Sequence, residues 1–265
     1  MFDIVRKEPA KAHAPIEAWI QRDFAVSLFQ QAGLDFEAMK RSSQSKDFKP
    51  VKLDGVSFSA AFAVESQRII SQNVAAVLPG SKHPDQTIIY SGHWDHLGVG
   101  VADADGDAIY NGAHDNASGA AIVLDVARAY AALATRPRRS VLFLFVTAEE
   151  RGLLGSDYFA RNPTVPKGGI VADLTLDMPF LFHPLLDIVP YGAQHSTLAA
   201  PVSKAAQHLG IEIGTDPIPE QVLFIRSDHF SFVRQGVPSL FIKSGFKTGD
   251  PARDGSAINA AYRRD

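Results

Sequence analysis

The apolar run SVLFLFVT at residues 140–147 most restricts what this chain can fold into. Hydrophobic side chains occupy almost every position of the run, which is typical of a strand covered on both faces. From about residue 56 onward, strand-like and helix-like segments alternate around it. The chain is therefore predicted to form a three-layer α/β/α sandwich around a mixed, mostly parallel sheet.

Periodicity predicts the other elements. Strands are expected at 57–65, 68–80, 86–92, 169–177, 185–191 and 238–245, the first two paired antiparallel at a sheet edge. Helices are expected at 115–134, 196–210 and 227–236. The second of these ends at Gly210, a residue that favours helix termination.

The first 50 residues read differently from the rest. Apolar residues between 16 and 34 recur at helical spacing up to Gly33, and a second short helix is expected at 35–43. The polar stretch 44–55 contains Pro50 and Gly55 and resembles a domain edge. We therefore expect a helical segment at 1–50 and a separate domain at 51–265.

Composition excludes several classes. The chain is 46% hydrophobic and 21% charged with a net charge of -3, so a general nucleic-acid binder, which is usually basic, is not expected. No uninterrupted apolar run is long enough for a membrane-spanning helix. The absence of cysteine rules out disulfides, thiolate metal sites and a cysteine nucleophile.

Acidic residues and histidines gather where the predicted strands end. They follow three strands and open the helix at 115–134: His93, Asp95, Asp115, Glu149, Glu150 and Asp177. In open α/β sheets, ligands bind at the carboxyl ends of the strands. Carboxylates converging there would raise one another's pKa, and a divalent cation removes that repulsion. With histidine and no cysteine among the ligands, the sequence predicts a catalytic zinc site.

Several of these residues also have a simpler interpretation. His93 is predicted as a ligand, with Asp95 as the carboxylate that orients its ring, since metal-bound histidines commonly donate to a carboxylate. His96 is interpreted as a structural neighbour. Taken alone, Asp115 fits a helix N-cap and Asp177 a strand-end cap.

The pair Glu149–Glu150 is the least ordinary feature, because two adjacent acids follow the central strand directly. A solvated loop is the simpler interpretation. The functional one has one carboxylate bind metal while its neighbour acts as a general base on water.

Four motifs in series resemble one known family. They are SGHWDHLG at 91–98, NGAHDNASG at 111–119, TAEERGLLGS at 147–156 and LTLDM at 174–178. In this order they resemble the di-zinc aminopeptidases of clan MH, metallopeptidase family twenty-eight, a group that includes bacterial leucyl aminopeptidase, aminopeptidase Y and glutamate carboxypeptidase. The resemblance covers roughly residues 56–250 and implies the zinc-exopeptidase fold.

The resemblance also implies residue roles. His93 and Asp177 would bind the first zinc, and Asp115 would bridge both ions. Glu150 would bind the second zinc, and Glu149 would be the general base.

Further roles follow from the same resemblance. Asp95 would orient His93, and the peptide bond after Asp115 would be cis. The triplet at 227–229 would form part of the substrate pocket: Ser227, Asp228 and His229.

The implied activity is hydrolysis of peptide bonds at the N-termini of peptides or small proteins. Two Zn²⁺ ions would serve it, with Co²⁺ or Mn²⁺ as substitutes. Relatives of this kind imply a periplasmic or secreted protein. The segment WIQRDFAVSLF at 19–29 resembles the tail of a protease-associated insert.

One departure bears on activity. The family takes one more histidine for its second zinc from beyond the strand at 238–245, and this sequence has no histidine after His229. We therefore expect a C-terminally incomplete domain that is weak or inactive. The alternatives are a non-catalytic peptide- or receptor-binding domain on the same fold, a carboxypeptidase with Arg226 or Lys243 as its cationic clamp, and a glutaminyl cyclase.

Overall fold

The computed structural model describes residues 3–4, 16, 18–63, 65–179 and 182–262, which divide into two compact units. One unit holds the described residues between 16 and 69. The other holds residues 3–4 and the described residues from Ile70 onward. The division falls later than the predicted boundary at residue 50. The described residues of 51–69 form no strand that would join them to the sheet, so the strand predicted at 57–65 is wrong.

The first unit contains the two predicted helices, α1 (Arg22–Gln31) and α2 (Phe36–Ser42). Gly33 follows α1 with a left-handed backbone (φ 71°). Asp35 caps α2 by accepting the N–H of Ala38, and Phe29 packs edge-on against Phe36 at 5.2 Å between ring centroids. These local contacts confirm both helices.

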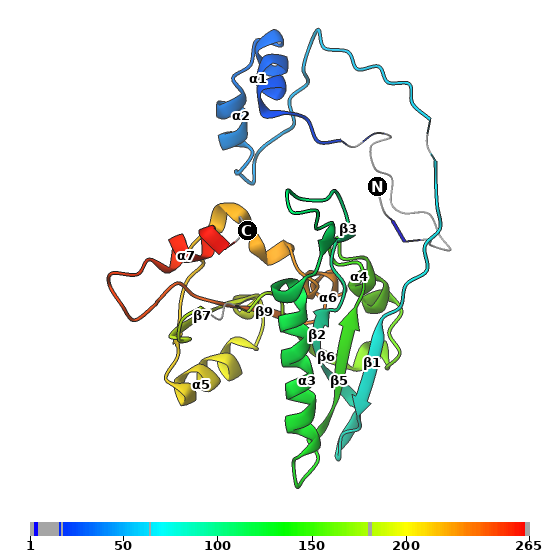
Figure 1. Ribbon diagram of the computed structural model, residues 1–265, viewed down its shortest axis with the longest axis vertical. Helices are drawn as coiled ribbons and strands as arrows, with labels where there is room; N and C mark the ends of the chain where they lie inside the picture. The colour runs from blue at the N-terminus through cyan, green and yellow to red at the C-terminus, as the bar shows by residue number, and fades with distance from the viewer. Residues whose placement is uncertain (1–2, 5–15, 17, 64, 180–181, 263–265) are drawn as a thin grey trace. The chain divides into compact units, whose positions relative to one another are not determined.

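The second unit is built on a seven-stranded mixed sheet with the order β1-β5-β2-β6-β9-β7-β8 (Figure 1). Its strands are β1 (Val74–Leu78), β2 (His83–His93), β5 (Arg139–Val146), β6 (Ile170–Thr175), β7 (Asp187–Tyr191), β8 (Glu212–Ile213) and β9 (Ser239–Ser244). Strands β5, β2, β6 and β9 are mutually parallel, while β1 and β7 run antiparallel to β5 and β9. The edge strand β1 pairs with β5, not with the segment 57–65 as predicted.

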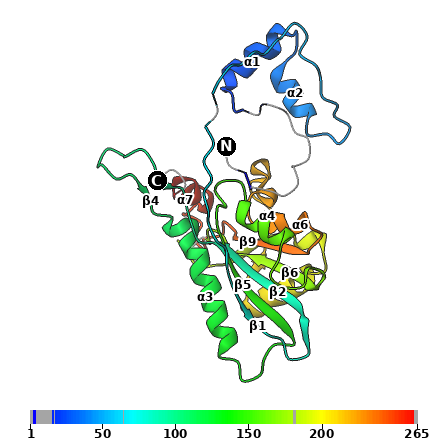
Figure 2. The ribbon, with the colours of Figure 1, turned by 90° about the vertical axis from the view of Figure 1, so that its right-hand side faces the viewer.

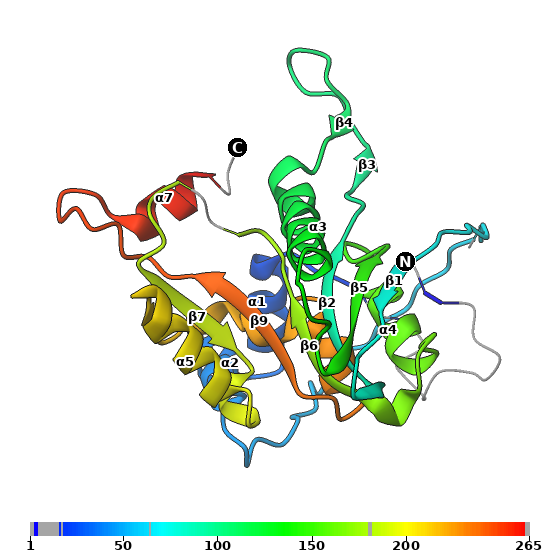
Figure 3. The same ribbon diagram turned by 90° about the horizontal axis from the view of Figure 1, so that it is seen from below.

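Helices cover both faces of this sheet, as the apolar run predicted. Alternate residues of β5 serve opposite faces: Leu142 and Leu144 pack toward α4, whereas Val141 and Phe143 pack toward α3. Figure 3 shows α3 and α4 on opposite sides of the sheet, and Figure 2 shows α3 lying along β2 and β5. The three-layer fold class is confirmed.

The helices of the second unit are α3 (Ser118–Ala131), α4 (Leu154–Arg161), α5 (Ala199–Leu209), α6 (His229–Val233) and α7 (Gly255–Tyr262). Shorter turns lie at Ala113–Ala117, Lys167–Gly169, Ala193–His195, Pro219–Gln221 and Leu223–Ile225, and a small hairpin joins β3 (Gly98–Val99) to β4 (Ile109–Tyr110). Helix α5 ends at Gly210 as predicted, with φ 68°. The sequence analysis assigned no helix to the residues of α7. None of the described helices is long and apolar enough to cross a membrane.

Candidate metal centre

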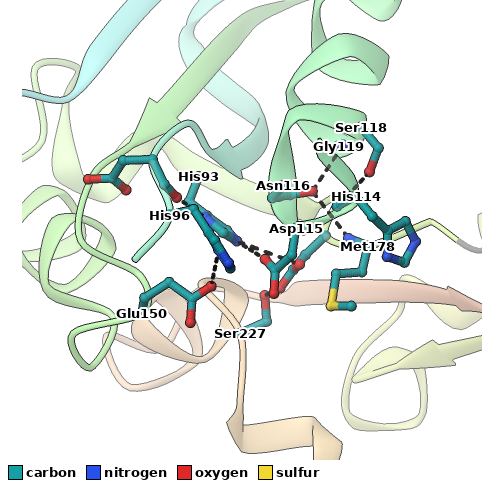
Figure 4. Close-up of polar contacts among 12 residues, drawn as sticks. His93, His96, His114, Asp115, Asn116, Ser118, Gly119, Glu150, Met178 and Ser227 are labelled. Carbon is teal, nitrogen blue, oxygen red and sulfur yellow. Dashed lines mark hydrogen bonds and ion pairs between the residues drawn. The ribbon is translucent and has the colours of Figure 1, made fainter. Parts of the chain in front are cut away.

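The parallel strands β2, β5 and β6 deliver the predicted residues to one edge of the sheet. His93 is the last residue of β2, Glu149 and Glu150 follow β5, and Asp177 follows β6. Asp115 lies in the turn that precedes α3, and its side chain meets His93 in Figure 4. The structure therefore brings together five residues that lie far apart in the sequence.

His93 is fully buried, and its Nε2 atom faces two carboxylates. Nε2 lies 3.0 Å from Oδ1 of Asp115 and 3.6 Å from Oδ1 of Asp177. Ligand atoms about 2.0–2.2 Å from a tetrahedral zinc lie roughly 3.4 Å from one another, so these spacings suit one shared ion. His93, Asp115 and Asp177 form one group able to hold a metal.

Asp115 also belongs to a second such group, with His96 and Glu150. Nδ1 of His96 lies 2.7 Å from Oε1 of Glu150. Two ligand groups that share one carboxylate fit a pair of ions bridged by Asp115, the arrangement that the family resemblance implies. Glu149 lies beside them, with ligand atoms of His93, Glu149 and Glu150 all within 4.8 Å of one another.

The contact of Asp95 with His93 differs from the predicted one. Nδ1 of His93 lies 2.8 Å from the main-chain carbonyl of Asp95, not from its carboxylate. The carboxylate instead accepts the hydroxyl of Thr147 and the N–H of Ala148, the latter at 2.8 and 2.9 Å. Asp95 therefore touches His93 through its backbone and holds the turn that carries Glu149 through its side chain.

Asn116 ties the segment of Asp115 to that of Asp177. Its amide donates to the carbonyl of Leu176 at 2.9 Å, and its Oδ1 accepts the N–H of Gly119 and of Met178 at 2.9 and 3.1 Å. Asn116, and not Asp115, therefore caps the first turn of α3. The carboxylate of Asp115 faces His93 instead. The Asp115–Asn116 peptide bond is cis, as expected.

Gly119 lets the start of α3 approach the metal centre. A Cβ atom there would lie 2.3 Å from both Oδ1 of Asn116 and the carbonyl oxygen of Leu176. Real Cβ contacts are not this short, so only glycine fits beneath the turn.

The pKa values of the site residues reflect the crowding of its carboxylates. Burial, followed by the charges of Asp228 and Asp177, raises the pKa of Glu149 to about 9. Burial opposes protonation of His93, yet its contacts with Asp115 and Asp177 outweigh that and raise its pKa to about 12. Without a cation the cluster retains protons, and a bound cation would displace them.

The donor atoms also fit a metal. Among the described residues, four buried atoms of the two groups make no well-aligned hydrogen bond: Nε2 of His93, Nδ1 of His96, Oε1 of Glu150 and Oδ1 of Asp177. Buried polar atoms are normally satisfied, so this set is what a nitrogen- and oxygen-liganded cation requires.

The three residues predicted to form part of the substrate pocket are completely buried in the structure: Ser227, Asp228 and His229. Ser227 donates to Oδ2 of Asp177 at 2.7 Å. Burial raises the pKa of Asp228 to about 7 and lowers that of His229 to about 4. Ser227 thus contacts a predicted metal ligand, and the part of these three residues in a substrate pocket stays a prediction.

A small pocket lies beside the chain neighbours of two predicted ligands. It begins at His114 and Met178, the neighbours of Asp115 and Asp177, and its lining includes Tyr191, Leu223 and Phe246. His114 itself points away from the acids and contacts the carbonyl of Pro179 at 2.9 Å, so it is no ligand here (Figure 4).

Sequence reasoning missed two residues of this site. Asn116 carried a signal, since asparagine is a strong capping residue directly before a helix. His96 was assigned a purely structural place, because the direction of its ring depends on how the loop after β2 folds.

Residues 73–261 match the sequence pattern of peptidase family M28, which is most of the chain. This chain belongs to peptidase family M28. The family resemblance drawn from the four motifs is confirmed. Among curated relatives, a probable zinc metalloprotease of Pyricularia oryzae is 36% identical over 125 residues, which make up 46% of this chain and 23% of that protein. The alignment thus spans less than a quarter of the relative.

Solved structures show the same fold. A zinc aminopeptidase from Bacillus subtilis aligns with a TM-score of 0.52 and 20% identity over 69% of this chain and 41% of its own. A glutaminyl cyclase from Porphyromonas gingivalis aligns with a TM-score of 0.51 and 20% identity, over 68% and 65%. This M28 fold therefore occurs in proteins of different activity, and the active-site chemistry has to be argued from the site.

Proposed function

We propose that this M28 chain is a zinc-dependent exopeptidase, and specifically an aminopeptidase that uses two zinc ions. The observation that carries the proposal is the pair of ligand groups sharing Asp115, with Glu149 beside them. Zinc is favoured because the donor set is nitrogen and oxygen only, and because the relatives named above are zinc proteins. Cobalt or manganese would suit the same donors.

The ions would be held by the residues that already converge. His93 and Asp177 would hold the first, Glu150 the second, and Asp115 both. When bound, zinc lowers the pKa of water and polarises a carbonyl group. Glu149 would accept the proton of the attacking water and return it to the leaving amine, and the carboxylate of Asp95 would keep the Glu149 turn in place.

An N-terminal rather than a C-terminal specificity is supported by the charges around the pocket. A carboxypeptidase needs a cationic group for the substrate carboxylate. Lys243 lines the pocket, but its ammonium donates to the carbonyls of Asp177 and Met178 at 3.2 and 3.0 Å. The acids of the centre would attract an ammonium group.

The test is a Glu149→Gln variant. Turnover of leucine p-nitroanilide should fall by about 10²–10⁴-fold because the general base is lost, while bound zinc stays at the wild-type level. Glu220→Gln, which changes an exposed acid, is the matched control and should keep both. Unchanged turnover in Glu149→Gln would remove Glu149 as the base.

Substrate choice separates the alternatives. N-acetyl-leucine p-nitroanilide should resist cleavage, since it lacks the free amino group. Cleavage of N-blocked peptides from their C-terminus would instead establish a carboxypeptidase. Cyclisation of N-terminal glutamine without hydrolysis would establish a cyclase, and peptide binding without turnover would establish a binding domain.

A further inference from the structure

The residues that precede β1 lie at the same edge of the sheet as the metal centre. β1 runs antiparallel to β5, so the start of β1 pairs with the carboxyl end of β5 (Figure 1). The segment 71–73 therefore lies beside the loop that links β5 to α4. This glutamate loop, residues 148–154, carries Glu149 and Glu150.

Asn73 bonds to both ends of the glutamate loop. Its Oδ1 accepts the N–H of Thr147 at 3.0 Å, just before the loop, and its Nδ2 donates to the carbonyl of Gly155 at 2.8 Å, just after it. The N–H of Gly155 also donates to the carbonyl of Thr147 at 2.9 Å. A Cβ atom on Gly155 would lie 2.2 Å from that carbonyl oxygen and 2.7 Å from Oδ1 of Asn73. One side-chain amide therefore closes the tightly packed base of the loop.

The glutamate loop has a strained backbone that needs such support. Ala148 (φ 56°) and Leu153 (φ 59°) are left-handed without being glycine. Conformations of this kind persist only where the surrounding contacts fix them. Ala148 comes directly before Glu149, so its backbone sets the direction in which that carboxylate leaves the strand. The carboxylate of Asp95 accepts the N–H of Ala148, and Asn73 accepts the N–H before it.

The residues on the N-terminal side of Asn73 contact the same edge of the sheet. The hydroxyls of Ser71 and Thr147 lie 2.6 Å apart. The main-chain carbonyl of Gln72 accepts the indole N–H of Trp94, which follows β2, at 3.2 Å. Asn73 differs from both in that its side chain binds main-chain atoms at the two ends of the glutamate loop.

We propose that Asn73 is a positioning residue, which holds the glutamate loop so that Glu149 and Glu150 face the metal ions. The inference rests on the proposed two-zinc function and gives a part to a residue outside the four motifs of the family resemblance. An amide suits this place because it both donates and accepts, and it adds no charge beside the crowded carboxylates. Hydrogen bonds from such outer residues keep a site in its productive geometry.

The first test measures amide hydrogen exchange in the zinc-free protein. Asn73→Leu removes both bonds at a similar side-chain size, so exchange in the glutamate loop should quicken by roughly 5–100-fold, the effect of two lost hydrogen bonds. Exchange in β2 and β6 should stay as in the wild type, because the opening is local. Wild-type exchange in the loop, or equal acceleration throughout the sheet, would overturn the proposal.

Two further variants sharpen this test. Asn162→Leu is the matched control, since Asn162 also donates to a carbonyl of α4, that of Tyr158 at 3.1 Å, and it should leave the glutamate loop unchanged. Asn73→Asp keeps the acceptor for the N–H of Thr147 and loses the donor to Gly155. Its loop should exchange faster than the wild type but more slowly than Asn73→Leu. This variant decides the matter if Asn73→Leu does not fold, and wild-type exchange in it would count against the proposal.

The second test asks whether Asn73 acts through Glu149. In Asn73→Leu at saturating zinc, kcat for leucine p-nitroanilide should fall by about 10²-fold, the effect of a reacting group displaced by about 1 Å, with KM unchanged. In a Glu149→Gln background the same substitution should cost little more, because residues that act as a unit are not additive. An equal loss in both backgrounds would indicate general damage and overturn the proposal.

The outcomes separate this inference from the proposed function. If Glu149→Gln loses turnover while Asn73→Leu matches the wild type in exchange and in kcat, only the role of Asn73 is overturned. If Glu149→Gln keeps full turnover, the proposed function fails, and the exchange measurement still decides whether Asn73 holds the loop.

Discussion

Asp157 and Asp177 are both nearly buried acids, yet their surroundings are opposite. Asp157, in α4, accepts bonds from Nε of Arg161 to both of its oxygens at 2.9 Å, and Arg234 lies 3.9 Å away. Asp177 faces a cluster of other acids, and its Oδ1 makes no hydrogen bond with a described residue. The chain therefore supplies an arginine for the single acid at one place, whereas at the other it supplies the buried His93 for several acids.

This difference separates a structural acid from a functional one. A buried carboxylate with an arginine is stable without any added ligand, whereas an acid among other carboxylates has its pKa raised unless a cation lies beside it. The raised pKa of Glu149 records that condition. Burial would raise the pKa of Asp177, but His93 and Lys243 lie near it and lower that pKa. Perturbed acids in a group are therefore a better indicator of a site here than burial alone.

The largest expected effect is that of zinc on stability. At a free zinc concentration 1,000 times the dissociation constant, the free energy of unfolding should rise by about 4 kcal/mol, since the unfolded chain lacks the assembled site. Asp115→Asn should lose most of that increment because both ions share this residue. Urea unfolding with zinc and with a chelator measures it, and an increment in Asp115→Asn equal to that of the wild type would contradict the bridging role.

The pH dependence should be next in size. Asp173 is wholly buried beneath the centre, where it accepts bonds from Ser91 and Thr175 at 2.8 and 3.0 Å, and burial raises its pKa from 3.8 to about 7. The folded protein thus holds this proton more tightly than the unfolded chain does. Its contribution to stability is full below pH 3.8 and is lost as the pH rises through about 7.

Asp173→Asn should remove this loss. Between pH 5 and 8, the free energy of unfolding of the zinc-free wild type should fall by about 2–3 kcal/mol more than that of the variant. Asp125→Asn, which changes an exposed acid of α3, should follow the wild type. Parallel pH curves for wild type and Asp173→Asn in urea unfolding would show that Asp173 is not protonated in the folded state.

The elements that sequence predicted well are those set by local pattern. The apolar run of β5 and the helical periodicity of α3 are patterns within short stretches of sequence. Both elements therefore form near their predicted positions. The segment 57–65, predicted as a strand, has alternating apolar residues that include Phe58 and Phe62. Both side chains are exposed, and the described residues of the segment pair with no strand. Strand formation depends on a neighbour that the local sequence does not specify.

The same distinction holds at the metal centre. That His93, Asp115 and Asp177 would meet followed from topology, because parallel strands end at one edge. Two features could not be predicted in this way: the atom of Asp95 that faces His93, and the burial of Ser227. Both depend on side-chain directions within loops. Those directions are set by contacts from distant segments, such as the bond from Asp95 to Ala148.

The smallest effect on stability should come from breaking the ion pair of Asp157 with Arg161. Arg161→Ala should lower the free energy of unfolding by only about 1–2 kcal/mol, because the arginine is 38% exposed and solvent screens the pair. The loss should be the same with zinc and with chelator, unlike that of Asp115→Asn. A double-mutant cycle with Asp157→Asn measures the pair itself. If the Arg161 loss grew when zinc was removed, the two groups of acids would be coupled, and the separation between the structural and the functional carboxylates would fail.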